Sequence, residues 1–150
     1  MNKDIEKIED RLKDLVTKNE DAIKGFEKAA KNADEVGVKT YFEKKIVERM
    51  HFLKELRGAA TDLDLGSIEI DGSAAGAVHR TWMDVKAFFS GDNDEAMLEE
   101  AIRGDKSAME DYDEALAETM MPHRIKDLIR AQREKLQNDL ETSEILENYR

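Results

Sequence analysis

Apolar residues recur at spacings of three and four along four long stretches of this chain, which is the period of one face of an α-helix. These stretches run from about 3 to 33, from about 38 to 60, from about 92 to 116 and from about 122 toward the C-terminus. Each would form a long helix with one apolar face, and such faces are stable only when they pack against one another. The pattern therefore predicts an all-α bundle of four long helices.

The composition supports this fold and indicates a single domain. Glycine and proline number only 8 and 1, and charged residues make up 39% of the chain, as is typical of long helices with solvated outer faces. A chain of 150 residues is long enough to bury one continuous core without disulfides. We therefore interpret residues 1–150 as one helical domain.

The charge and the missing residue types exclude several classes of function. A net charge of −11 opposes sequence-independent binding to nucleic acids and to anionic membranes. The charged N-terminus differs from a signal peptide, and no window approaches the roughly 18 apolar residues of a membrane span. The absence of cysteine excludes thiol catalysis, disulfides and thiolate metal sites, so we expect a cytoplasmic protein.

The stretch between the second and third long helices, residues 61–91, is expected to form a crossover connection. Residues 61–73 lose the helical period, whereas Ser73 can N-cap a shorter helix over residues 74–89. A connection of about thirty residues can cross the length of the bundle, so the helices before and after it can run parallel. This order predicts a ferritin-like four-helix bundle. A simple up-and-down bundle with a capping helix is the alternative topology.

Each long helix carries one polar residue in the middle of its apolar face. These residues are Asn19, Arg49, Asp105 and Gln132. Because each lies near the midpoint of its helix, we expect the four side chains to meet at one height as a buried polar layer. A buried Arg49 needs an acid, and Asp105 is the natural partner, while the two amides can satisfy the remaining donors and acceptors. In the alternative, Arg49 extends its charged end to solvent and the amides are only half-buried.

Di-iron four-helix bundles keep their metal at this place, usually with a Glu-x-x-His motif on two of the helices. Glu48 and His51 have this spacing, but the helical projection turns both side chains away from the apolar face. Glu134 also points outward and has no matching histidine, and a guanidinium at the centre would repel a cation. We therefore predict no metal and no other cofactor. The alternative is an iron or manganese site that uses Glu27, Glu48 and His51.

One segment, His79-Arg80 followed by Trp82-Met83-Asp84 with glycines on either side, is the most specific motif of the chain. Other segments accompany it, namely Asn19-Glu20-Asp21, Gly25 to Ala30, Gly72-Ser73 to Gly76, Gly91-Asp92 and Ala115-Leu116. Together they resemble an uncharacterised bacterial family of ferritin-like four-helix-bundle proteins of unknown function. The resemblance implies the bundle fold with the crossover helix, a bacterial source and a relationship to ferritins in fold, without an assigned activity.

The sequence leaves three hypotheses for function. The first is a non-enzymatic structural, interaction or stress-associated protein that can form a homo-oligomer. In this hypothesis the buried polar layer has replaced the metal cavity. The chain also shows no nucleophile elbow and no glycine-rich phosphate loop. The second is a metal-binding protein, oxidase-like or related to storage. The third is a small-molecule site between the crossover helix and the bundle, in an apolar pocket lined by Trp82 and Phe89. Separately, His79, Arg80 and Trp82 can form a functional surface. Trp82 also suits packing of the crossover helix against the bundle.

Overall fold

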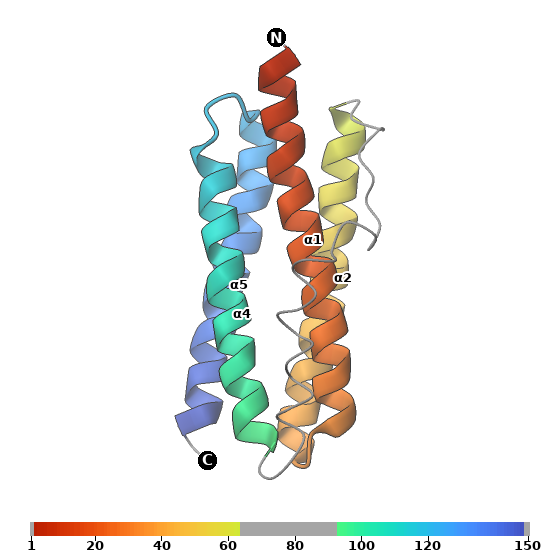
Figure 1. Ribbon diagram of the computed structural model, residues 1–150, viewed down its shortest axis with the longest axis vertical. Coiled ribbons are helices and arrows are strands. Elements are labelled where there is room, and N and C mark those ends of the chain that lie inside the picture. The colour runs from red at the N-terminus through yellow and green to blue at the C-terminus, as the bar shows by residue number, and fades with distance from the viewer. Residues whose placement is uncertain (1, 64–92, 149–150) are drawn as a thin grey trace.

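The computed structural model describes residues 2–63 and 93–148, which form the bundle shown in Figure 1. Within these ranges the chain forms helices α1 (Asn2–Asn32), α2 (Val36–Asp62), α4 (Asn93–Ala117) and α5 (His123–Asn148), and it contains no strand. The predicted all-α bundle of four long helices is therefore confirmed, with bounds within a few residues of those expected from the periodicity.

The four helices form two antiparallel hairpins. The short segment 33–35 joins α1 to α2, and segment 118–122 joins α4 to α5. α1 packs beside α2 and α4, whereas α5 packs beside α4 and α2, so α2 and α4 lie across the diagonal of the bundle. Figure 1 shows that α2 and α4 run in the same direction. This is the expected order for a bundle with one long connection. The connection and its predicted helix, residues 74–89, lie outside the described residues.

Two apolar clusters fill the bundle, one in each half. The larger lies toward the α4–α5 turn and includes Leu12, Leu15, Phe52, Leu56, Tyr112, Ile125, Ile129 and Leu136. The smaller lies toward the α1–α2 turn and includes Ala22, Phe26, Ala30, Val38, Phe42, Met97, Leu98 and Ala101. Along α4, Asp105 falls between Ala101 of the smaller cluster and Ala108 of the larger. The two clusters therefore meet near a band of polar side chains.

A buried carboxylate at the start of α4 fastens the α1–α2 turn to the second hairpin. Asp94 is fully buried, and its Oδ1 and Oδ2 accept hydrogen bonds from the backbone N–H groups of Asp34 and Glu35, each at 2.8 Å. Glu35 is the N-cap of α2, where backbone N–H groups lack helical partners and the helix dipole favours negative charge. Asp94 therefore satisfies both donors and fixes the position of one hairpin against the other.

We expect Asp94→Ala to lower the free energy of unfolding by about 2 to 4 kcal/mol, because two backbone N–H donors lose a buried, charged acceptor. Asp94→Asn keeps one acceptor oxygen, so its free energy of unfolding should fall by less than that of Asp94→Ala. Urea denaturation followed by circular dichroism would measure both changes. Asp113→Ala is the matched control, since Asp113 pairs with Arg133 on the exposed surface, where such a pair contributes about 1 kcal/mol at most. An equal loss in the Asp94 and Asp113 variants would contradict the role of Asp94.

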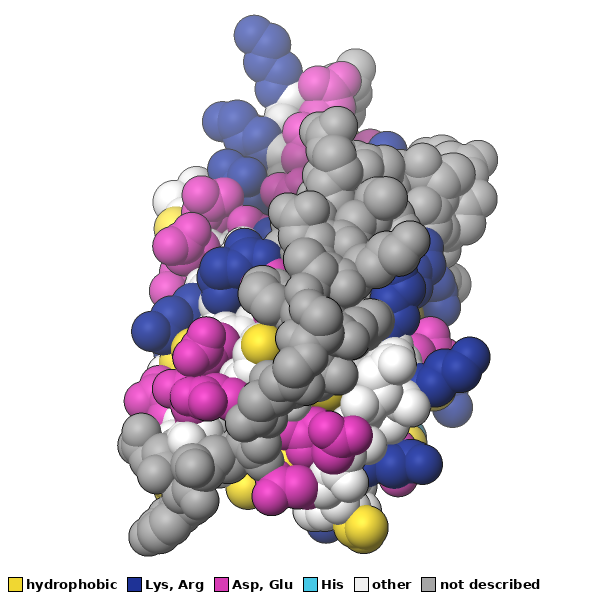
Figure 2. Space-filling model, turned by 60° about the horizontal axis from the view of Figure 1, so that its bottom comes forward, with side chains coloured by type: hydrophobic (Ala, Val, Ile, Leu, Met, Phe, Trp, Pro, Cys, Tyr) yellow, Lys and Arg dark blue, Asp and Glu magenta, His cyan; other side chains and the backbone are white. Residues whose placement is uncertain are grey.

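The outer surface of the described helices is strongly charged. Figure 2 shows acidic and basic side chains mixed over the visible face, with few apolar side chains between them. None of the described helices is both long and apolar enough to cross a membrane.

Candidate functional site

The centre of the bundle holds a carboxylate between two cations. Asp105 Oδ2 accepts a hydrogen bond from Lys45 Nζ at 2.5 Å, and Asp105 Oδ1 accepts one from Arg49 Nη2 at 2.9 Å. Lys45 and Arg49 lie one turn apart on α2, so both side chains leave the helix on the same face. All three side chains are at most 2% exposed. The two long cationic side chains thus cross the core to bind an acid on the diagonal helix.

Two further acids surround the same cations from the α2–α5 side. Asp139 Oδ2 lies 3.6 Å from Lys45 Nζ and 3.5 Å from Arg49 Nη2. Glu48 Oε1 lies 3.6 Å from Arg49 Nε. Both acids are half-buried. We call these five residues, Lys45, Glu48, Arg49, Asp105 and Asp139, the ion cluster.

The ion cluster reaches charge balance if one of its three acids is protonated, and Glu48 is that acid. Burial raises the pKa of Glu48 to about 8, helped by a hydrogen bond to Asp139 and by the negative charge of Asp139. At neutral pH Glu48 is therefore mostly uncharged and can donate its proton to Asp139. Two positive charges then face two negative charges, which limits the cost of burying them.

The pKa of Asp105 is shifted in the opposite direction to that of Glu48. Its burial alone would raise the pKa of the carboxyl, but the charges of Lys45 and Arg49 and their hydrogen bonds outweigh burial and hold the pKa of Asp105 below its usual value. Arg49 is equally buried, and the nearby acids raise the pKa of its guanidinium further. Asp105 and Arg49 therefore stay ionised at neutral pH.

Aromatic rings line the cationic side of the ion cluster. Lys45 Nζ lies 4.8 Å from the ring centroid of Phe26 and 5.3 Å from that of Tyr41. Arg49 Cζ lies 5.5 Å from the centroid of Phe26. The negative faces of these rings attract the cations in a place that water does not reach. The rings thus compensate part of the lost hydration of Lys45 and Arg49.

A second polar network lies closer to the α4–α5 turn. Asn19 Nδ2 donates a hydrogen bond to the hydroxyl of Tyr112 at 2.9 Å, and that hydroxyl donates to Gln132 Oε1 at 2.6 Å. Gln132 Nε2 donates to the carbonyl oxygen of Phe52 at 3.2 Å and to Glu55 Oε1 at 3.0 Å. Burial raises the pKa of Tyr112 above its usual range, so its hydroxyl remains a donor. We call Asn19, Tyr112 and Gln132 the amide–tyrosine network.

The structure buries all four residues expected in the polar layer, each to 1% exposure. It joins Arg49 to Asp105, as their chemistry suggests. It does not bring the four together at one height, because Asn19 and Gln132 meet through Tyr112, which follows Asp105 by seven residues, or about two turns of α4. The expectation of a single layer was wrong in this respect. The bundle has two separate polar networks along its axis.

The predicted outward position of Glu48 is also wrong. The prediction used only the apolar stripe of α2, and Glu48 lies at the edge of that stripe. α5 packs against this edge and brings Asp139 to Glu48, so only 25% of the Glu48 side chain is exposed. A position at the edge of one helix stripe can be covered by a neighbouring helix, and the sequence of a single helix does not show which edge is covered.

Sequence reasoning did not assign Asp139 or Tyr112 to a polar network. The buried cation that it missed altogether is Lys45. It follows the buried Phe42 by three residues and precedes Arg49 by four, so it lies on the apolar face of α2. That spacing is the signal that could have revealed it. A lysine at such a position is usually assumed to extend its amine to solvent, and here the amine binds Asp105 instead.

The residues of the alternative metal site are not assembled. Glu27 and His51 are exposed, whereas Glu48 belongs to the ion cluster. Within residues 2–63 and 93–148, no three His, Cys, Asp or Glu side chains form a group that could hold a metal ion. His79, Arg80 and Trp82, expected as a functional surface, lie outside the described residues.

These observations define the chain as an all-α four-helix bundle with two buried polar networks in its core. The chain belongs to the family described as Domain of unknown function (DUF2383), which matches residues 7–118. The match spans α1, α2 and α4 and ends before α5. No curated protein and no solved structure matches the chain.

Proposed function

We propose that this chain is a ferritin-like bundle protein in which the ion cluster occupies the core position of a metal centre, and that it serves a non-catalytic structural or interaction role. The observation that carries this proposal is the pairing of Asp105 with both Lys45 and Arg49 in a site that solvent hardly reaches. The parallel run of α2 and α4 supports the ferritin-like order of helices. A cytoplasmic location suits a chain without cysteine.

The donor set of the ion cluster fits a divalent metal poorly. Asp105 uses both oxygens for hydrogen bonds to cations. Asp139 Oδ2 has no hydrogen-bond partner among the described residues, yet it lies within 3.6 Å of both Lys45 Nζ and Arg49 Nη2. A metal ion bound to that oxygen would approach two fixed positive charges at short range in a low-dielectric core, where repulsion is strong. The internal cations therefore take the place that a metal would need.

The ion cluster also offers little access for a substrate. Three of its five side chains are at most 2% exposed. Among the residues that the structure describes, two surface hollows lie away from the ion cluster, one between α1 and α2 over Ile23 and Leu53, and one between α4 and α5 over Ile102. A reaction at Asp105 would require the helices to separate. The geometry favours a role in holding the bundle together over a role in catalysis.

Metal loading tests the proposal. Protein purified without a metal column, incubated with excess Fe²⁺, Mn²⁺ or Zn²⁺ and then desalted, should retain less than about a tenth of an equivalent by elemental analysis, because the described helices offer no open ligand set. Its thermal midpoint should be the same with and without a chelator.

Stoichiometric metal would support the alternative, an iron or manganese site, and would contradict the proposal. Two variants would then locate the site. Loss of the metal in both His51→Ala and Glu48→Gln would place it on α2, whereas Glu134→Gln, an exposed position on α5, is the matched control that should retain it.

A further inference from the structure

The side of α2 that faces away from the bundle carries a continuous stripe of exposed residues. Its members recur at spacings of three and four and are Val36, Thr40, Glu43, Val47, Met50, Lys54, Gly58 and Thr61, all of them exposed. We call them the outer stripe. They lie on the side of α2 turned away from Arg49, because a rotation of about 100° per residue displaces them from it by roughly 100° to 180°.

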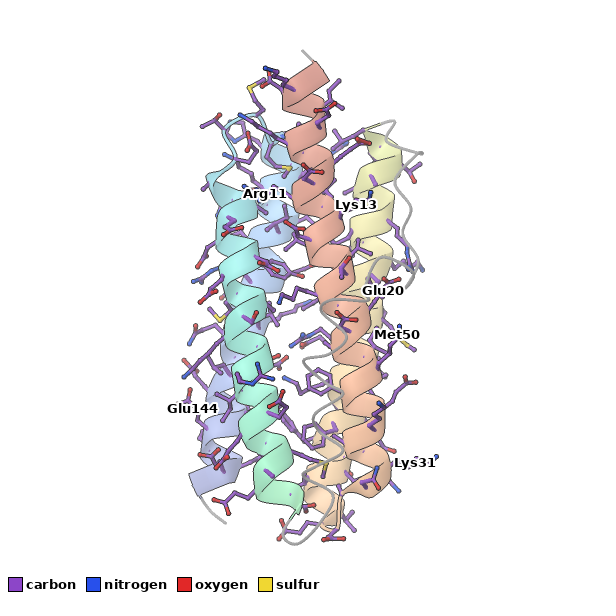
Figure 3. All side chains as sticks on the ribbon, in the orientation of Figure 1. Arg11, Lys13, Glu20, Lys31, Met50 and Glu144 are labelled. Atoms are coloured by element: carbon purple, nitrogen blue, oxygen red, sulfur yellow. The ribbon has the colours of Figure 1, made fainter. Side chains whose placement is uncertain are left out.

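Apolar side chains occupy the middle and one end of the outer stripe. Val36, Val47 and Met50 are 79%, 55% and 52% exposed, and they are three of the six large apolar side chains exposed in the described residues. Figure 3 shows Met50 projecting outward from α2. A Cβ atom added at Gly58 would meet nothing within 4 Å, so another backbone could approach closely there. Val47 and Met50 are thus neighbouring exposed apolar side chains at the middle of the outer stripe, and such a pair can pack against a partner.

We propose that the outer stripe binds the outer stripe of a second copy of this chain, with the two α2 helices antiparallel about a two-fold axis that passes between Val47 and Met50. In such an isologous contact each residue meets the residue at the mirrored position of the stripe. The proposal is independent of the proposed core function, since no residue of the ion cluster belongs to the outer stripe.

The chemistry of the outer stripe is self-complementary in this arrangement. Val47 of one copy meets Met50 of the other, and both are apolar. On either side, Glu43 meets Lys54, so each two-fold contact contains two acid–base pairs. Farther out, Thr40 lies near Gly58, where the small residue allows close approach. Val36 meets the methyl-bearing Thr61 at the ends. Each level thus combines residues that attract or fit one another.

The charges of the outer stripe also select the antiparallel direction. In a parallel pair in register, Glu43 would face Glu43 and Lys54 would face Lys54, and like charges in contact repel. The antiparallel pair replaces both repulsions by attractions. The stripe from 36 to 61 extends for about 38 Å at the rise of an α-helix, which offers a long but narrow contact. A contact of this shape is suited to a reversible dimer.

Sedimentation velocity of the full chain over about 5 to 200 μM tests the proposal, because a reversible dimer of micromolar affinity would shift in population over this range. We expect a concentration-dependent dimer. Val47→Glu combined with Met50→Glu should raise the dissociation constant by about a hundredfold or more, since four carboxylates would enter the apolar centre.

Charge reversal tests the pairing itself. Glu43→Lys alone or Lys54→Glu alone should raise the dissociation constant about tenfold, because two attractions become two repulsions. The double variant Glu43→Lys with Lys54→Glu restores both pairs and should return to within about threefold of the original value. Glu134→Lys, on the exposed side of α5, is the matched control and should dimerise like the unchanged chain.

Three outcomes would overturn the proposal. The chain could stay monomeric over the whole concentration range. Its dimer could tolerate the single reversals at positions 43 and 54. The double reversal could fail to rescue either single reversal. Thermal unfolding of each variant shows whether the bundle itself is intact, and we expect it to be, because the side chains of Glu43 and Lys54 are both exposed.

Discussion

Asp105→Asn is expected to lower the free energy of unfolding by about 3 to 5 kcal/mol, because it leaves the buried Lys45 and Arg49 without their shared negative charge. The substitution preserves the shape of the side chain, so the loss reports charge and hydrogen bonding rather than a cavity. Asp139, the next acid, lies at 3.5 Å or more from both cations and is half-buried, so it cannot replace Asp105. Urea denaturation at pH 7 measures the change.

Arg49→Met is the informative comparison for Asp105→Asn. It removes one cation but leaves Asp105 bound to Lys45, so the acid retains a partner. The free energy of unfolding should therefore fall by less than in Asp105→Asn. Asp113→Asn, on the exposed α4–α5 surface, is the matched control for the chemical change and should cost about 1 kcal/mol at most. A loss below about 1 kcal/mol in Asp105→Asn would show that the ion cluster is hydrated in solution.

Raising the pH from 5 to 9 is expected to destabilise the protein through Glu48. Its pKa is about 8 in the folded chain against an ordinary value of 4.5, so between these values the folded state holds a proton that the unfolded state has released. The unfolded state then binds fewer protons, and the free energy of unfolding falls as pH rises, by at most about 1.4 kcal/mol per pH unit. The stabilising effect of the proton is complete below pH 4.5 and is lost once the pH passes about 8.

Glu48→Gln isolates this contribution, since the amide cannot ionise but can still donate to Asp139. At pH 9 the variant should be more stable than the unchanged chain by about 2 to 3 kcal/mol, a figure reduced from the full pKa shift because part of the side chain is exposed. At pH 5 the two should be nearly equal. Glu134→Gln, at an exposed position of α5 outside the outer stripe, is the matched control. Parallel pH profiles for the unchanged chain and Glu48→Gln would contradict the protonation of Glu48.

The acid side of the stability profile depends on Asp105 instead. Its pKa in the folded chain is lower than its ordinary value of 3.8. The stability that it contributes is therefore complete above pH 3.8 and is lost as the pH falls through the lower folded value. Glu48 and Asp105 thus act in separate pH windows, and Asp105→Asn should remove part of the acid dependence while leaving the alkaline one.

The helices and the identity of several buried polar residues could be predicted from the chain alone. A helix repeats its environment every three or four residues, so the apolar spacing in α1 or α5 is visible without any knowledge of its neighbours. The same rule marks Arg49 and Asp105 as buried, and electrostatics then makes them partners. These predictions depend only on local geometry and on the cost of burying a charge.

The arrangement of the polar networks could not be predicted in this way. Whether Asn19 reaches Gln132 or Arg49 depends on the relative height of helices that are far apart in sequence, and Tyr112 decides it by lying between the two amides. Whether Glu48 is buried depends on which edge of α2 is covered by α5. Whether the amine of Lys45 stays in the core depends on an acid within reach of its long side chain, and here that acid is Asp105.

Periodicity along one chain thus determines which face of each helix is buried, because a side chain's direction follows from its place in the helical turn. It does not determine how far one helix slides along another, and a shift of one turn changes every partner across the core. The ion cluster and the amide–tyrosine network are separate because packing places Asp105 and Tyr112 at different heights. The charge state of Glu48 follows from the acid and the cations that the neighbouring helices bring to it.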